Sequence, residues 1–104
     1  MMKIATIASA RSFSSREIRQ NELLRGHDLH VTLLCFEAGQ QAEEAQAPFE
    51  LLYQVLEGEM LFHQGDARQR IGKGKLLLVP ANTPHLLENA GGGLLVVMKT
   101  GRSA

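Results

Sequence analysis

The stretch from Gly74 to Asn89, GKLLLVPANTPHLLEN, limits the possible folds of this chain more than any other segment. A glycine turn precedes a run of apolar residues that is typical of a strand, and two prolines follow before His85. Proline fixes its own backbone angle and cannot donate to a β-ladder, so Pro80 and Pro84 are expected to form a rigid bend. The segment therefore holds one imidazole in a fixed place, which is what a metal site or a polar ligand site requires.

Short apolar segments, separated by Gly, Pro and polar turns, follow one another along most of the chain. We predict strands at 29–36, 51–56, 60–63, 68–71, 76–79, 85–87 and 94–98. Strands of this length and spacing favour an antiparallel sandwich or barrel. Helix signals are weak, because the capping box at 14–17 lacks an apolar stripe after it and the segment 43–47 stops at Pro48.

The length of 104 residues predicts a single domain that covers positions 1–104. No segment has the apolar length of a membrane span, so we expect no contact with a membrane. The single Cys35 lies in an apolar run and has no partner for an intrachain disulfide, which favours a buried thiol and a cytoplasmic location.

Charge is distributed unevenly although the formal net charge is zero. Residues 1–25 hold five basic and two acidic side chains, residues 26–67 hold eight acidic and no Lys or Arg, and residues 68–104 hold six basic and one acidic. We expect these segments to neutralise one another in the folded protein. With no Trp and one Tyr, the chain lacks the basic face and stacking residues of a nucleic-acid-binding protein.

The segment described first resembles the second motif of the cupins, G-x5-P-x-G-x2-H-x3-N. Its positions fall on Gly74, Pro80, Asn82, His85 and Asn89, with Pro84 inside it. Asn82 replaces a glycine of the motif, and because Asn tolerates a left-handed backbone, we expect the bend to survive. The resemblance implies an all-β fold of the RmlC-like type, an antiparallel double-stranded β-helix or jelly-roll barrel. It covers about residues 29–98, and we expect an N-terminal edge strand at about 12–25.

The first cupin motif, G-x5-H-x-H-x3-4-E-x6-G, is matched only at its glycines, Gly39 and Gly58. The two metal histidines that the resemblance implies fall at Ala45 and Ala47, and the glutamate falls at Leu51. Glu50 is one residue away, and a shift of one residue on a strand turns a side chain to the opposite face. Of the four ligands that the family implies, only His85 is present.

One imidazole supplies a small part of the affinity of a metal site, which normally needs three or four ligands. We therefore expect no tightly bound cofactor, with a divalent metal ion as the alternative if Glu43 and Glu44 turn toward His85. Without a metal, His85 is expected to form hydrogen bonds with Tyr53, Gln54 or a backbone carbonyl. The other histidines are His27, His30 and His63, and alternation with Met60 and Phe62 places His63 toward solvent.

Two classes of function follow. The first is a non-enzymatic module that binds a small molecule in the mouth of the barrel, with His85, Tyr53 and Gln54 as ligand-binding residues. The second is a cupin enzyme: a metal-dependent dioxygenase, or a metal-free sugar epimerase or isomerase with His85 as the catalytic base and Tyr53 as the acid. The resemblance also implies a homodimer in which sheet edges pair, with Phe13, Ile18, Leu23 and Leu24 available to cover an edge.

Overall fold

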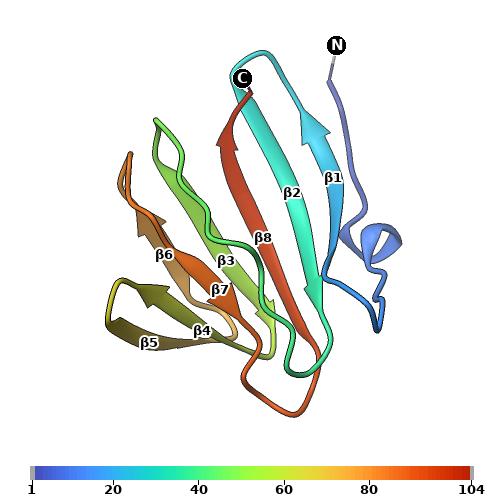
Figure 1. Ribbon diagram of the computed structural model, residues 1–104. Helices are drawn as coiled ribbons and strands as arrows, with labels where there is room; N and C mark the ends of the chain where they lie inside the picture. Colours follow the sequence, from blue (N-terminus) through green and yellow to red (C-terminus); the bar gives the residue numbers. More distant parts are fainter. Residues whose placement is uncertain (1, 104) are drawn as a thin grey trace.

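The computed structural model describes residues 2–103 and has one short 3₁₀ helix followed by eight strands (Figure 1). The elements are η1 (Ile7–Ala10), β1 (Arg19–Arg25), β2 (Leu29–Phe36), β3 (Leu51–Glu57), β4 (Glu59–Gln64), β5 (Ala67–Gly72), β6 (Leu76–Val79), β7 (Leu86–Glu88) and β8 (Leu95–Arg102). All named strand pairs are antiparallel. The predicted all-β antiparallel class is confirmed.

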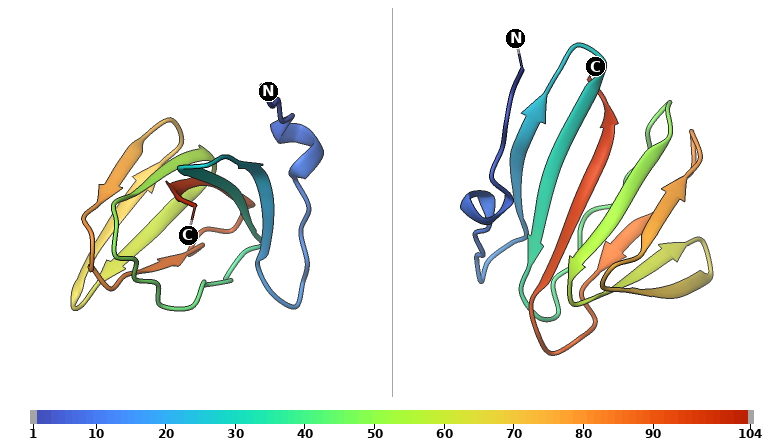
Figure 2. Two further views of the ribbon diagram at one scale, coloured as in Figure 1. Left: turned by 90° about the horizontal axis from the view of Figure 1, so that it is seen from above. Right: turned by 180° about the vertical axis from the view of Figure 1, so that it is seen from behind.

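The strands form two sheets that face each other. The larger sheet has the order β1-β2-β8-β3-β6 and the smaller has the order β5-β4-β7. Seen from above, the two sheets and the segment between β2 and β3 enclose the interior (Figure 2). Neighbours in the larger sheet come from distant parts of the chain, as in the pairing of β2 with β8, which is the arrangement of a jelly-roll barrel.

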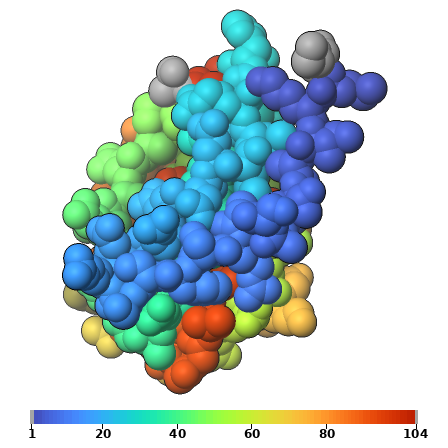
Figure 3. Space-filling model, turned by 90° about the vertical axis from the view of Figure 1, so that its right-hand side faces the viewer, coloured from blue at the N-terminus to red at the C-terminus, as the bar shows by residue number. Residues whose placement is uncertain are grey.

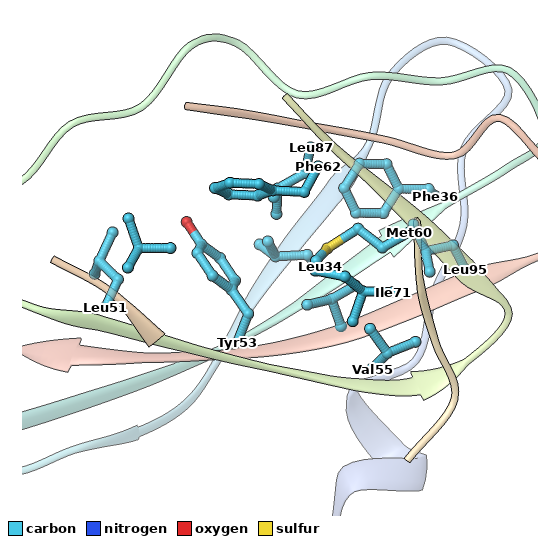
Figure 4. Close-up of a cluster of buried hydrophobic side chains, with 12 residues drawn as sticks. Leu34, Phe36, Leu51, Tyr53, Val55, Met60, Phe62, Ile71, Leu87 and Leu95 are labelled. Atoms are coloured by element: carbon cyan, nitrogen blue, oxygen red, sulfur yellow. The ribbon is translucent and has the colours of Figure 1, made fainter. Parts of the chain in front are cut away.

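The barrel interior is filled by apolar side chains from both sheets (Figure 4). Phe36, Tyr53, Met60 and Leu95 are fully buried there, each projecting from a different strand. Burial of this much apolar surface is the main stabilising contribution to such a fold. The residues that alternate with them along β2 and β8 point to the outside of the larger sheet.

A second apolar cluster lies on that outer face and contains Leu33, Cys35 and Val96. Phe13 from the N-terminal segment and Leu23 from β1 pack against it. Figure 3 shows the N-terminal segment, in dark blue, lying across this side of the molecule. The segment therefore covers an apolar sheet face that would otherwise be open to water, and Cys35 is a buried free thiol as expected.

Several of the tight turns depend on left-handed backbone. Gly58 has φ 83°, and a Cβ atom built on it would collide with the carbonyl oxygen of Leu94. Among residues 2–103, Asn82 is the only non-glycine residue with positive φ, at 60°. This is the conformation expected for the residue that replaces a glycine of the second motif, and the backbone N–H of Asn82 donates to the carbonyl of Ala47.

Most strand positions agree closely with those expected from the sequence, and the largest extension is β8, which continues to Arg102. The N-terminal edge strand expected at about 12–25 is wrong in its first half, because β1 begins at Arg19. Residues 12–18 form no strand, and their apolar side chains Phe13 and Ile18 pack against the two apolar clusters. The helix η1 has no counterpart among the expected elements. The segment 43–47 is irregular, as predicted, apart from an isolated bridge at Ala45. Within the described part of the chain, no helix is long and apolar enough to span a bilayer.

Candidate functional site

Tyr53 and His85 form a buried hydrogen-bonded pair between the two walls of the barrel. The hydroxyl of Tyr53 lies 2.7 Å from Nε2 of His85. Tyr53 projects inward from the middle of β3, and His85 stands just before β7, after the bend that Pro80 and Pro84 form. Their exposed fractions are 1% and 2%, so the pair is inaccessible to bulk solvent except through the cavity described below.

The hydrogen bonds of the imidazole fix its tautomer. Nδ1 of His85 lies 2.7 Å from the carbonyl oxygen of Thr83. A carbonyl oxygen only accepts, so Nδ1 carries the proton and donates. In the neutral ring this leaves Nε2 as an acceptor, and the Tyr53 hydroxyl donates to it. Both ring nitrogens are thus occupied by protein partners.

Aromatic packing also fixes the position of the Tyr53–His85 pair, and burial changes its electrostatics. The ring of Phe62 stacks on His85 at a centroid distance of 5.6 Å, and Tyr53 meets the imidazole edge-on at 5.5 Å. Figure 4 shows the Tyr53 hydroxyl pointing away from β3 toward Phe62. Burial raises the pKa of the Tyr53 phenol, because the charged phenolate would be poorly solvated there.

A cavity of about 590 Å³ opens over this pair at the mouth of the barrel. Its floor includes Tyr53, His85, Leu34 and Leu87, and Lys99 enters it from β8. The rest of its lining comes from the segment before β1, from β1 itself and from the irregular segment after β2: Arg16, Glu17, Ile18, Gln20, Gln40, Gln41, Ala42, Glu43, Glu44 and Ala45. The size of this cavity is within the range of small-molecule sites, and its lining combines a partly apolar floor with a mostly polar wall.

One of the positions of the missing metal ligands, Ala45, lies directly beside His85. Ala45 forms an antiparallel bridge with His85, and their backbone groups exchange hydrogen bonds of 2.7 and 3.0 Å. Ala47 and Leu51 both pack against the interior cluster. Glu50 is exposed, as the alternation of side chains along an extended segment predicts, so it does not replace the absent glutamate.

The other candidate ligands do not assemble a metal site. His27 is exposed, His30 contacts Glu22 at 3.0 Å, and His63 contacts Glu88 at 2.8 Å. Glu43 and Glu44 line the cavity but are exposed, although Glu44 also lines a smaller cavity of about 260 Å³ with His63 and His85. No group of three or more His, Cys, Asp or Glu within residues 2–103 is arranged to hold a metal ion. These donors do not fit the metal centre that the family implies.

The remaining residues singled out from the sequence have different placements. Gln54 follows Tyr53 on β3 and therefore faces away from the barrel interior, and it does not line the cavity. Gly39 and Gly74 have φ values of 81° and 85° in turns. Asn89 is buried, and its side-chain amide donates to the carbonyls of Glu37 and Gly93. These last residues hold the loops of the barrel together and do not line the cavity.

Sequence reasoning missed Lys99 as a cavity residue. The expected strand ends at residue 98, so the sequence pattern assigns Lys99 to neither the inner nor the outer face of the barrel. The signal is present, because extending the alternation of Leu95 and Val97 by one step places Lys99 on the same inner face. Residues 16–20 and 40–45 were also missed, since the closure of two irregular segments over a barrel mouth has no periodic pattern.

Comparison with known proteins supports the fold described above. Residues 32–100 match the model of the cupin domain family. No curated protein shows a significant match to the chain. The structure resembles TT1209 from Thermus thermophilus, with a TM-score of 0.87, 17% identity, and coverage of 97% of this chain and 98% of that one.

Two further solved structures show the same likeness. An uncharacterised conserved protein with a double-stranded β-helix domain from Klebsiella pneumoniae has a TM-score of 0.89 and 18% identity, with 98% and 90% of the two chains covered. An RmlC-like cupin protein from Desulfovibrio desulfuricans has a TM-score of 0.80 and 25% identity, with 95% and 96% covered. The family match spans well over half of the sequence, and the likeness in fold extends over nearly the whole chain. The chain therefore belongs to the cupin family.

Proposed function

We propose that this cupin binds a small organic molecule in the cavity at the barrel mouth. In this proposal the protein catalyses no reaction on the molecule and holds no tightly bound metal ion. The observation that carries the proposal is the cavity of about 590 Å³ whose floor contains the hydrogen-bonded pair of Tyr53 and His85. The apolar floor offers surface to bury, and the polar pair offers orientation. Gln54 has no part in this proposal, because it faces the other side of β3.

The donor set supports binding over metal-dependent oxidation. Three of the four positions that carry ligands in the family motif are Ala45, Ala47 and Leu51, and none of these side chains can donate an electron pair. A metal at His85 would also have to displace the Tyr53 hydroxyl from Nε2. Any divalent ion would then have one protein nitrogen and water as its ligands, which gives weak binding.

The geometry also supports binding over metal-free isomerisation. A histidine base and a tyrosine acid must both reach the substrate to move a proton across it. Here the Tyr53 hydroxyl and Nε2 of His85 are hydrogen-bonded to each other at 2.7 Å, which leaves no space for a substrate between them. The group that the pair still offers is the Tyr53 oxygen, because its proton is donated to His85. The proposed role of the pair is therefore to orient a ligand from one side by accepting a hydrogen bond at that oxygen.

The test is a screen for binding by two-dimensional NMR of ¹⁵N-labelled protein purified without added metal. A panel of neutral and charged fragments should shift the amide signals of Tyr53 and His85. The variant Ala45→Phe should weaken these shifts, because Ala45 lines the cavity beside His85 and a phenyl ring there would occupy part of the space next to the Tyr53–His85 pair. Ala81→Phe, at an exposed position outside this cavity, is the matched control. Absence of any cavity shift at millimolar fragment concentrations would refute the proposal.

We also propose that the protein is a cytoplasmic homodimer. The outer face of β3 and the edge strand β6 exposes a row of leucines, Leu52, Leu76 and Leu78, with exposed fractions of 37%, 63% and 57%. A second copy laid on this face would remove the row from water and cover the edge of the sheet. Light scattering of the wild-type protein at micromolar concentration should give twice the chain mass. The double variant Leu76→Glu, Leu78→Glu should give the mass of one chain. A monomeric wild-type protein would refute this assembly.

A further inference from the structure

Lys99 is placed inside the barrel by the alternation of β8. Leu95 and Val97 point into the interior cluster, and Lys99 continues the same face. In the larger sheet Lys99 lies between Thr32 of β2 and Tyr53 of β3, its direct cross-strand neighbours. Its side chain therefore enters the cavity next to the Tyr53–His85 pair, which lines the same space.

The inner face of the sheet changes character at this row. One step deeper the cross-strand row is Leu34, Val97 and Val55, which are all buried and apolar. Lys99 thus stands where the apolar core ends and the cavity begins. A lysine at this boundary lays its aliphatic stem along the core and brings its ammonium group to the cavity.

The ammonium group has no ion-pair partner in the described chain. The ion pairs found within residues 2–103 engage Arg11, Arg25, His30, His63 and Arg70, and Lys99 is absent from them. Burial lowers the pKa of Lys99, because the charged form has lost part of its hydration. A cation that is half-buried without a partner costs free energy, and an anionic ligand would recover that cost.

We propose that Lys99 is the anion-binding group of this cavity, and that the ligand is a small organic monocarboxylate. The inference rests on the proposed binding function and names its ligand class. The carboxylate receives a charge-assisted hydrogen bond from Lys99, and the apolar part of the acid lies toward Leu34 and Leu87 on the cavity floor.

The charges around the cavity favour one negative charge over two. Glu17, Glu43 and Glu44 lie in the lining, and the only other Lys or Arg among these described lining residues is Arg16, which is exposed. A phosphate or a dicarboxylate brings two negative charges close to these three acidic side chains, and among the described lining residues Lys99 is the one cation deep in the cavity that would balance the added charge. A monocarboxylate matches the single ammonium group of Lys99.

The experiment compares acids with their uncharged amides on the full-length protein. The probes are benzoate with benzamide, phenylacetate with phenylacetamide, and hexanoate with hexanamide, titrated against ¹⁵N-labelled protein at neutral pH. We expect at least one acid to shift the amides of Tyr53, His85 and Lys99 with a dissociation constant about tenfold below that of its amide, as one charge-assisted bond implies. Lys99→Met should remove this preference, whereas Lys99→Arg should retain it.

Lys73→Met, which removes an exposed lysine outside the cavity, is the matched control and should keep the preference. Amides that bind as well as acids would overturn the role of Lys99 while leaving the binding function intact. A preference for acids that survives in Lys99→Met would overturn it as well. If neither acids nor amides reach the cavity, the proposed function itself fails, and the assignment of Lys99 fails with it.

Discussion

Ala45 and His85 are direct neighbours at the barrel mouth, joined by a pair of backbone hydrogen bonds. The position at which the family motif has its first metal histidine is therefore beside the one ligand that this chain retains. The fold that carries the metal centre in the family motif is present, but the side chains at the other three ligand positions are two methyl groups and a leucine, at Ala45, Ala47 and Leu51. This relationship makes the loss of metal ligands testable by restoring them.

The triple variant Ala45→His, Ala47→His, Leu51→Glu should gain affinity for Zn²⁺ or Mn²⁺ that the wild-type protein lacks. With His85 it offers three imidazoles and a carboxylate, a complete set for either ion. The variant should be less stable than wild type without metal, because Leu51 is buried, and its Tm should rise when metal is added. Calorimetric titration and thermal melts measure both effects. Equal metal binding by the wild-type protein would contradict the expectation.

Tyr53→Phe should lower the free energy of unfolding by about 1–3 kcal/mol, because it leaves Nε2 of His85 buried without a donor. Urea denaturation measures this loss. Thr83→Val is the control: it removes a hydroxyl but keeps the carbonyl that accepts from Nδ1, so its effect should be much smaller. Similar losses in the two variants would mean that the hydrogen bond between Tyr53 and His85 contributes little.

The contribution of Tyr53 to stability should depend on pH in the alkaline range. Because burial raises the folded-state pKa of the phenol, the unfolded chain loses this proton first as pH rises above about 10. The stability that Tyr53 supplies is complete below that pH and decreases as pH rises toward the folded pKa. The difference in unfolding free energy between wild type and Tyr53→Phe should therefore narrow as pH is raised beyond the unfolded pKa of about 10. A constant difference would argue against the raised pKa.

Lys99→Met should stabilise the protein at neutral pH, since it removes a desolvated charge that no carboxylate among residues 2–103 pairs with. For a lysine whose folded-state pKa is lowered, the cost is present at neutral pH and is relieved as pH rises toward the unfolded value of about 10.4. The gain in Tm of the variant should therefore shrink at alkaline pH. A residue that lowers stability while it supports ligand binding is characteristic of a functional site. A lower Tm for the variant at pH 7 would show that Lys99 is a structural residue.

Gly58→Ala should destabilise the fold more than Gly39→Ala. Both glycines have positive φ, which costs a non-glycine residue on the order of 1 kcal/mol. Only at Gly58 would the added Cβ also meet backbone, at the Leu94 carbonyl oxygen, whereas nothing lies within 4 Å at Gly39. Chemical denaturation of both variants separates the conformational cost from the steric one. Equal losses would mean that the segment at Leu94 moves without cost.

The sequence by itself determined the class of fold and most of its strands. Alternating apolar residues and turn-forming Gly and Pro are local signals, and the second motif, from Gly74 to Asn89, adds a fixed spacing that few folds share. It also determined that the side-chain metal ligands of the family motif are missing, since the methyl groups of Ala45 and Ala47 have no electron pair to donate in any conformation. These conclusions need no knowledge of which distant residues meet.

The tertiary structure decided what surrounds His85. The pairing of Tyr53 with His85 joins residues 32 positions apart and depends on the register of two separate sheets. Gln54 differs from Tyr53 in facing the other way, which alternation fixes once the inner face of β3 is known. Lys99 is a cavity residue because β8 pairs with β2 on one side and β3 on the other. Long-range strand pairing brings these groups together, and a local pattern carries no record of it.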